Sequence, residues 1–552
     1  MVRWPRFQAF WLPGLAVYVM LACLSAREVG LVGEVAIGWG TTSPPRVLAQ
    51  VEPPDTLAAP ALGPLTSQQT RPVERLVFGP VSVPVAVNAY TGGLSDIPAA
   101  CARALLGWRA GAWTGVALGG LLLLLASRFV MIHAGELPAG IAALLLASDW
   151  SFVFYKRVLS GTEVLLQAGA LLTVWAIWSR RWRGGAHGTL GIMLGIAFGL
   201  EAKVTFVCTL TAIGVAALLT RWDRPAVKAP APIRWPILAF GLVGLAPALV
   251  GIAHGAMVPE ALRVHSHDTL DLQVSRLFST GAMARESGEN LMAFLGDPNA
   301  FWSWALGARS VPVLSAGRAF GFVILVAGSA LAWRDRSGAP SPSDALLRFL
   351  SLLCPLQVGL LYLANHDLHH LAQASIFWCL WMALAACRFA ALVFRPRSVP
   401  RAIFAGVLIA PTVCAGANQL LETDAVLATA PQSTFRESGQ AALVGLLRAN
   451  DVHELVTSDY EVYGMIDIRA PEILVTHTWA AFSRKVREPW RVLTLARGGY
   501  YLSLRATAPM IYNWSPNPDQ VRRAALSAGV SVTEVGELRD GADLWASLWR
   551  VD

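Results

Sequence analysis

The chain has 552 residues, of which 55% are hydrophobic and only 14% are charged, and its mean hydropathy is +0.50. This apolar content exceeds what a soluble protein needs to fill its core, so it excludes the soluble globular classes and indicates a protein that lies in lipid. The formal net charge of +8 does not indicate nucleic-acid binding, because the basic residues fall between apolar runs and form no single patch or tail.

Eleven apolar runs have lengths close to that of a transmembrane helix. The run at 188–201 is short and can form a half-span joined to the next run by a tight turn. The first run follows a basic N-terminus, as in a signal peptide, but the many later runs predict a retained first helix. The runs are 7–24, 111–132, 137–155, 162–178, 188–201, 204–220, 235–257, 315–333, 346–364, 371–394 and 402–420. We therefore predict an all-α polytopic membrane protein with about eleven transmembrane helices.

Basic residues in the short connections predict the orientation of the chain. With the N-terminus in the cytoplasm, every strongly basic short connection falls on the cytoplasmic side, as expected for an inner-membrane protein. The C-terminal part then lies on the periplasmic side. The residues concerned are Arg180, Arg181, Arg183, Arg221, Arg224, Lys228, Arg234, Arg334, Arg336, Arg395, Arg397 and Arg401.

Three long segments remain on the non-cytoplasmic side. Residues 25–110 are rich in Pro, Gly and Thr, which predicts short interfacial helices and irregular loop, and residues 258–314 form a second loop. The segment from 421 onward alternates between helical patterns at 439–450 and 517–528 and strand-like patterns at 454–458, 530–535 and 545–551. We therefore predict two domains, a transmembrane domain over 1–420 that includes both loops and a small extracytoplasmic α/β domain over 421–552.

The seven cysteines indicate neither disulfides nor a cysteine-bound metal, because most lie within apolar runs and none shows CxxC spacing. They are Cys23, Cys101, Cys208, Cys354, Cys379, Cys387 and Cys414.

Ionisable residues collect beside the predicted spans on the non-cytoplasmic side. A charged side chain so close to the membrane costs free energy, and its presence there favours a functional role. Carboxylates next to cations at a membrane edge suit group transfer from a phosphate-linked lipid. A carboxylate can remove the proton of the acceptor, and a cation can stabilise the departing phosphate. The four groups are Arg27, Glu28 and Glu34; Lys156, Arg157 and Glu163; Glu201 and Lys203; and His366, Asp367, His369 and His370.

Several short motifs follow one another over about residues 10–400. They are Glu34 with Val-Ala-Ile-Gly-Trp, Tyr90-Thr-Gly with Pro98 and Leu106-Gly107, Tyr155-Lys-Arg157 with Glu163, Gly195-Ile-Ala-Phe-Gly-Leu with Lys203, and His366-Asp-Leu-His-His370. Their order resembles the GT-C superfamily of polyprenyl-phosphate-sugar-dependent glycosyltransferases, which includes protein O-mannosyltransferases and aminoarabinose transferases. The single Glu34 stands where the family has an Asp-Glu pair, and the late histidine motif lacks the family's Tyr and Pro.

The resemblance implies a GT-C-like membrane domain and an inverting hexosyl or pentosyl transferase with its active site on the periplasmic side. The donor would be a polyprenyl-phosphate-linked sugar, and the acceptor a lipid, a glycan or a protein. It further implies that Glu34 is the catalytic base, with Glu28 and Glu163 as further catalytic candidates. The implied donor-phosphate ligands are Lys156, Arg157, Lys203, His366, His369 and His370.

Simpler interpretations remain open for these residues. Glu34 can cap an interfacial helix, Glu163 can complement a helix dipole, and Lys156 can extend toward lipid head groups. No cofactor is predicted. A divalent metal is not favoured, because His369 and His370 are adjacent and cannot share one helix face. Two alternative functions also remain, a transporter or flippase of a lipid-linked or anionic substrate and a catalytically silent GT-C-like scaffold.

Overall fold

The structure is a computed structural model, and it describes the following parts of the chain. They are residues 4–24, 97–158, 162–183, 187–203, 205–220, 316–334, 341–364, 372–394, 399–428, 437–457, 492–504, 517–540 and 543–552, with short pieces at 75–92, 235–244 and 462–477.

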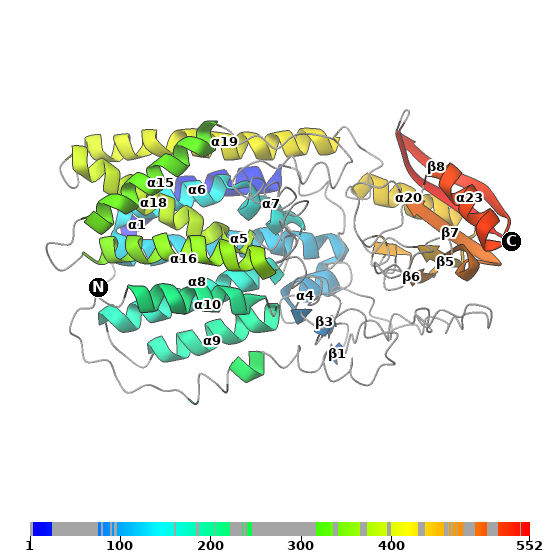
Figure 1. The fold of residues 1–552 in the computed structure, drawn as a ribbon, viewed down its shortest axis with the longest axis horizontal. Coiled ribbons are helices and arrows are strands. Elements are labelled where there is room, and N and C mark those ends of the chain that lie inside the picture. The colour runs from blue at the N-terminus through cyan, green and yellow to red at the C-terminus, as the bar shows by residue number, and fades with distance from the viewer. Residues whose placement is uncertain are drawn as a thin grey trace.

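Long apolar helices form a bundle that makes up most of the described chain (Figure 1). By length and composition, six described helices can cross a membrane, or seven if the bent pair α6 and α7 is one span, and three further helices are apolar but shorter. Ten of the eleven predicted runs coincide with these helices, and most of the run at 235–257 lies outside the described residues. The bundle helices are α1 (Trp4–Cys23), α5 (Trp108–Ala134), α6 (Glu136–Ser148), α7 (Trp150–Val158), α8 (Thr162–Arg183), α9 (His187–Ala202), α10 (Phe206–Leu219), α15 (Ala316–Arg334), α16 (Pro342–Ala364), α18 (Ser375–Val393) and α19 (Val399–Ala428). The predicted polytopic helical fold is confirmed.

Helix α18 lies at the centre of the bundle and is preceded by a short 3-10 helix, η4 (Ala372–Ala374). Apart from Arg388 it is apolar around its circumference, and it packs against α6, α15, α16 and α19. The peripheral helices instead expose apolar side chains. Val323 and Val326 of α15 and Ile403 and Val407 of α19 are 60% to 62% exposed. Such exposure is unfavourable in water and natural in lipid, so these faces are the lipid-facing surface.

Helices α8 and α9 form an antiparallel hairpin whose two backbones touch. A Cβ added to Gly169 of α8 would lie 2.8 Å from the carbonyl oxygen of Gly195 and 2.8 Å from the amide nitrogen of Gly199, both on α9. Only a residue without a side chain permits this approach, which is the usual use of small residues between membrane helices. The Gly195-x-x-x-Gly199 motif therefore fixes the register of the hairpin.

The described parts of the segment 25–110 contain more regular structure than the predicted irregular loop. Strand β1 (Arg75–Phe78) pairs antiparallel with β2 (Val81–Pro84), and β3 (Ala86–Asn88) pairs antiparallel with β4 (Thr91–Gly92). Helix α4 (Ile97–Leu106) follows and packs against α5. Strands this short carry little sequence signal, which explains the difference.

A small α/β domain completes the described chain, as predicted. Its five-stranded sheet has the order β6-β5-β7-β9-β8, in which β5 is parallel to β6 and β7, and β9 is antiparallel to β7 and β8. Apolar clusters cover both faces of the sheet, because alternate residues of each strand point to opposite sides. The elements are α20 (Glu437–Ala449), β5 (Glu454–Thr457), β6 (Leu474–His477), α22 (Val492–Leu495), β7 (Gly499–Leu504), α23 (Pro518–Ala528), β8 (Val532–Asp540) and β9 (Asp543–Val551).

The sheet domain contacts the bundle. Ala99 of α4 belongs to the buried cluster that contains Leu443 of α20, and Trp545 of β9 belongs to the buried cluster of the bundle. Figure 1 shows the sheet at one end of the bundle, where α1 ends and where α19 leads toward α20. We call this end of the bundle the sheet-side end.

Candidate functional site

The sheet-side end of the bundle begins at a break between α6 and α7. The two helices are bent by 55° relative to each other at Asp149. The Asp149 Oδ1 atom accepts a hydrogen bond of 2.8 Å from the amide nitrogen of Phe152, so its carboxylate caps the first turn of α7. Helix α7 is only nine residues long and therefore depends on contacts with its neighbours.

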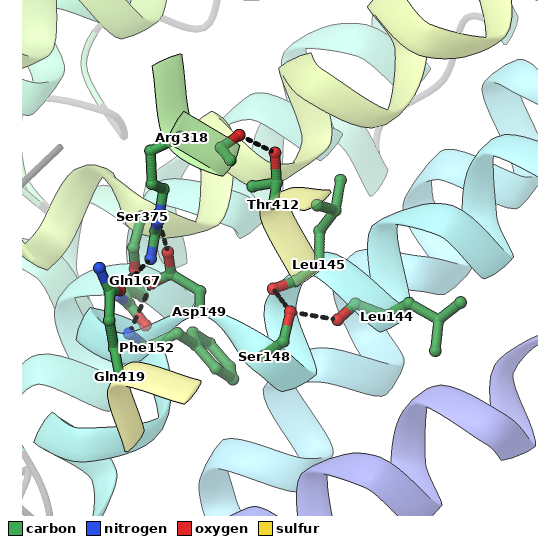
Figure 2. Close-up of polar contacts among 11 residues, drawn as sticks. Leu144, Leu145, Ser148, Asp149, Phe152, Gln167, Arg318, Ser375, Thr412 and Gln419 are labelled. Atoms are coloured by element: carbon green, nitrogen blue, oxygen red, sulfur yellow. Dashed lines mark hydrogen bonds and ion pairs between the residues drawn. The ribbon is translucent and has the colours of Figure 1, made fainter. Parts of the chain in front are cut away.

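A buried ion pair holds this break to two other helices. Arg318 Nη1 of α15 lies 3.3 Å from Asp149 Oδ2, and Arg318 Nη2 donates a hydrogen bond of 3.1 Å to Gln419 Oε1 of α19 (Figure 2). The side chains of Arg318 and Asp149 are 6% and 8% exposed. Charges this deep must be paired, and here one carboxylate both caps a helix and neutralises a guanidinium.

A small cavity adjoins this ion pair. Its polar lining comes from Ser148, Asp149, Arg318 and Thr412, and its volume is about 10 Å³, which is room for about one water molecule. A cavity of this size cannot hold a sugar or a lipid head group. The ion pair is therefore a structural feature of the bundle and not a substrate pocket.

The last turn of α7 carries two adjacent cations with different surroundings. Arg157 has a fully buried side chain, its Nη1 lies 2.7 Å from Asp424 Oδ1 of α19, and its Nη2 donates a hydrogen bond to the carbonyl oxygen of Leu21. Lys156 is also fully buried, and its Nζ lies 5.3 Å from the centre of the Phe152 ring. Within the described part of the chain this Nζ makes no hydrogen bond.

Two neighbours accommodate the Lys156 side chain. A Cβ added to Gly119 of α5 would lie 2.8 Å from Lys156 Cγ, so the absence of a side chain at this position makes room for the lysine stem. Glu163, in the first turn of α8, interacts electrostatically with Lys156. The ammonium group therefore has a counter-charge nearby although no described group accepts a hydrogen bond from it.

The α8–α9 hairpin places Lys203 at the same level as Glu163. Gly169 lies opposite the midpoint of Gly195 and Gly199, and both Glu163 and Lys203 are six residues from this crossing toward the sheet-side end. Both side chains are buried, with 1% and 0% exposure. Six residues of helix correspond to about 9 Å, so these two residues extend equally far along the hairpin.

The structure thus brings four of the predicted site residues to the sheet-side end, namely Lys156, Arg157, Glu163 and Lys203. The other predicted site residues, Glu28, Glu34, His366, His369 and His370, lie outside the described residues.

The sequence analysis missed the residues of α19 that contact α7. Thr423 Oγ1 accepts a hydrogen bond of 2.8 Å from Trp150 Nε1, and Asp424 and Gln419 make the contacts described above. The predicted apolar run ends at 420, before Glu422 and Asp424, whereas α19 continues to Ala428. The signal present in the sequence was the polar spacing of Gln419 and Thr423 on one helix face.

Comparison with known proteins gives a structural match but no sequence match. No protein-family profile matches the sequence, and no curated protein matches it. The crystal structure of ArnT from Cupriavidus metallidurans bound to undecaprenyl phosphate aligns with a TM-score of 0.50 and 9% identity, covering 98% of this chain and 98% of that chain. An oligosaccharyltransferase from Archaeoglobus fulgidus, in complex with Zn and sulfate, aligns with a TM-score of 0.47 and 13% identity over 90% of this chain and 68% of that chain. The match to ArnT over nearly the whole of both chains shows that this chain has the GT-C fold.

Proposed function

We propose that the protein is a membrane glycosyltransferase that moves a sugar from a polyprenyl-phosphate donor to a lipid, glycan or protein acceptor. The fold that it shares with ArnT supports this proposal, and that protein was solved with undecaprenyl phosphate bound. The observation that carries it is the buried pair of Lys156 and Glu163 at the sheet-side end of the bundle, with the buried Lys203 at the same level of the α8–α9 hairpin.

The chemistry of this group suits a phosphate on a lipid. An ammonium held away from water interacts more strongly with an anion than an exposed one does, and Lys156 brings its charge to the site without a hydrogen bond to any described residue. Glu163 balances that charge when no phosphate is present. Because the cations lie at helix ends, a lipid whose phosphate lies at their level can keep its chain in the bilayer.

The reaction that we propose is a single inverting displacement. Glu34 acts as the base that removes the proton of the acceptor hydroxyl, with Glu28 and Glu163 as the next candidates. Lys156 and Lys203 stabilise the polyprenyl phosphate as it leaves, together with His366, His369 or His370. We further propose that the protein lies in the inner membrane with its N-terminus in the cytoplasm, so that the sheet domain and the reaction lie on the periplasmic side.

The first test measures binding and transfer separately. Purified protein is incubated with undecaprenyl phosphate, and bound lipid is counted by native mass spectrometry. Transfer of labelled sugar from extracted lipid-linked donors is measured in parallel. Lys156→Gln should weaken lipid binding about 10- to 100-fold, the range expected when a charged hydrogen bond is lost. Glu34→Gln should bind the lipid normally and lose transfer. Arg523→Gln, on the exposed face of α23, is the matched control.

Each other outcome has a definite meaning. If Lys156→Gln binds and transfers as the wild type does, Lys156 is not part of the donor site. If the wild type neither binds undecaprenyl phosphate nor transfers sugar from any donor, the proposed function is wrong. If it binds the lipid and moves it between the leaflets of a vesicle without transfer, the protein is a flippase.

A further inference from the structure

The polar face of α19 makes a series of contacts with α7 and α15. Along α19, buried or partly buried polar positions recur at Thr412, Gln419, Thr423 and Asp424, and Gly416 lies between them on the same face. The opposite face is exposed, and it is apolar at Ile403 and Val407 and polar at Asn418 and Glu422. In a membrane helix such a polar stripe is costly unless each group is bonded to a neighbouring helix, so its partners show what the stripe does.

The partners of this face lie on α15 and at both ends of α7. On α15, the carbonyl oxygen of Gly317 accepts a hydrogen bond of 3.0 Å from Thr412 Oγ1. At the start of α7, Thr423 accepts the hydrogen bond of Trp150 Nε1, at 2.8 Å, and Gln419 accepts that of Arg318, which is paired with the capping residue Asp149. At the end of α7, Asp424 pairs with Arg157 at 2.7 Å. Helix α19 therefore fixes the position of a short helix whose last turn carries Lys156.

Close packing supports the same arrangement. A Cβ added to Gly416 would lie 2.1 Å from the carbonyl oxygen of Ser148, the last residue of α6 before the break. This contact between the α19 and α6 backbones leaves no room for the two helices to slide past each other. The break between α6 and α7 is therefore held from the α19 side by packing as well as by hydrogen bonds.

The surroundings of Arg157 differ from those of a free phosphate ligand. Its guanidinium is fully buried, and two of its nitrogens already bond to Asp424 and to the carbonyl oxygen of Leu21. Lys156, the next residue along the helix, points in a direction about 100° away and makes no hydrogen bond to a described residue. The two cations thus have separate surroundings although they are adjacent in sequence.

We propose that Asp424 and Thr423 are positioning residues, which hold α7 through Arg157 and Trp150 so that Lys156 meets the donor phosphate. This inference rests on the proposed function and assigns a different role to each of the two adjacent cations. Lys156 contacts the phosphate, whereas Arg157 acts through its ion pair with α19. Because α19 leads to the first helix of the sheet domain after residues 429–436, the same contacts connect that domain to the donor site.

A direct role of Arg157 in phosphate binding predicts the opposite change in lipid affinity when Asp424 is substituted. If Arg157 bound the phosphate directly, Asp424 would compete with the lipid for the guanidinium, and removing its charge would strengthen binding. If Asp424 positions α7, removing its charge weakens binding. The sign of the change in undecaprenyl phosphate affinity for Asp424→Asn therefore separates the two roles. A loss of stability alone would also weaken apparent binding, so the affinities are compared at equal folded fraction.

The experiment measures undecaprenyl phosphate binding by native mass spectrometry for the wild type, Asp424→Asn, Arg157→Gln, the double variant and Thr423→Val. We expect Asp424→Asn to weaken binding about 10- to 100-fold, the effect of misplacing a binding group by about 1 Å. The double variant should bind no more weakly than Arg157→Gln alone, because both substitutions break one contact. Asp519→Asn, in the exposed first turn of α23, and Thr211→Val, on an exposed face of α10, are the matched controls.

Thr423→Val keeps the inference testable if the charge variants do not fold, since it changes no charge and almost no volume. It should weaken binding several-fold by releasing Trp150. Tighter binding by Asp424→Asn, additive losses in the double variant, or unchanged binding by Thr423→Val would overturn the positioning role while the proposed function stands. Absence of binding by the wild type would overturn both.

Discussion

The glycine contact between α8 and α9 allows a quantitative test of how the site is assembled. In Gly169→Ala the new Cβ would lie 2.8 Å from two backbone atoms of α9, whereas ordinary contacts begin at 3.4 Å. The two helices must therefore separate by about 0.6 Å, and overpacking of this kind costs about 1–3 kcal/mol. The matched control is Gly214→Ala on α10, where an added Cβ meets no atom within 4 Å.

The control should be slightly stabilising, because alanine in a helix is favoured over glycine by about 0.5–1 kcal/mol. The same gain applies to Gly169→Ala, so the difference between the two variants isolates the clash and should be about 1–3 kcal/mol. Unfolding in mixed micelles, followed by far-UV circular dichroism, measures this difference. Gly169→Ala should also weaken undecaprenyl phosphate binding, because the separation displaces Glu163 relative to Lys203. Equal unfolding free energies for the two variants would refute the packing argument.

Two further predictions concern single polar contacts. Asp149→Asn keeps an oxygen that can accept the hydrogen bond of Phe152 but leaves the Arg318 guanidinium without its counter-charge. It should lower the free energy of unfolding by about 3–5 kcal/mol, and Arg318→Met in the same chain should restore most of that loss. Asn517→Ala removes the capping box that Asn517 forms with Gln520 at the start of α23. It should destabilise α23 by about 1 kcal/mol, measured as faster amide hydrogen exchange in that helix, with no effect on lipid binding.

Sequence reasoning located most of the helices because lipid imposes a long and nearly continuous apolar pattern. In the sheet domain it located α20, β5, α23, β8 and β9, whose capping residues or alternating patterns are local features of the chain. It missed β6, which has only four residues. It also missed β7, whose Gly499–Leu504 segment has buried residues in succession and no alternation.

The partners within the site were beyond sequence reasoning for a different reason. Arg157 and Asp424 are 267 residues apart, and Trp150 and Thr423 are 273 residues apart. The hydrophobic periodicity of a segment does not indicate which helices pack together. Each of these residues alone is consistent with a head-group contact. The sequence therefore predicts a functional role for the charges near Lys156 but does not show that Arg157 is paired with another helix.

The positions of the buried charges favour a transferase over a transporter. Each buried charged side chain among the described residues lies at a helix break or within two turns of a helix end, and six of the seven belong to the two polar groups near the sheet-side end. They are Asp149, Lys156, Arg157, Glu163, Lys203, Arg318 and Arg348. A transporter binds its substrate near the middle of the membrane, where it needs polar groups partway along its helices. An enzyme that acts on the phosphate of a lipid needs its charges at the depth of the head groups. In the part of the chain that the structure describes, Lys156, Arg157, Glu163 and Lys203 lie at helix ends, which is the arrangement that the second task requires.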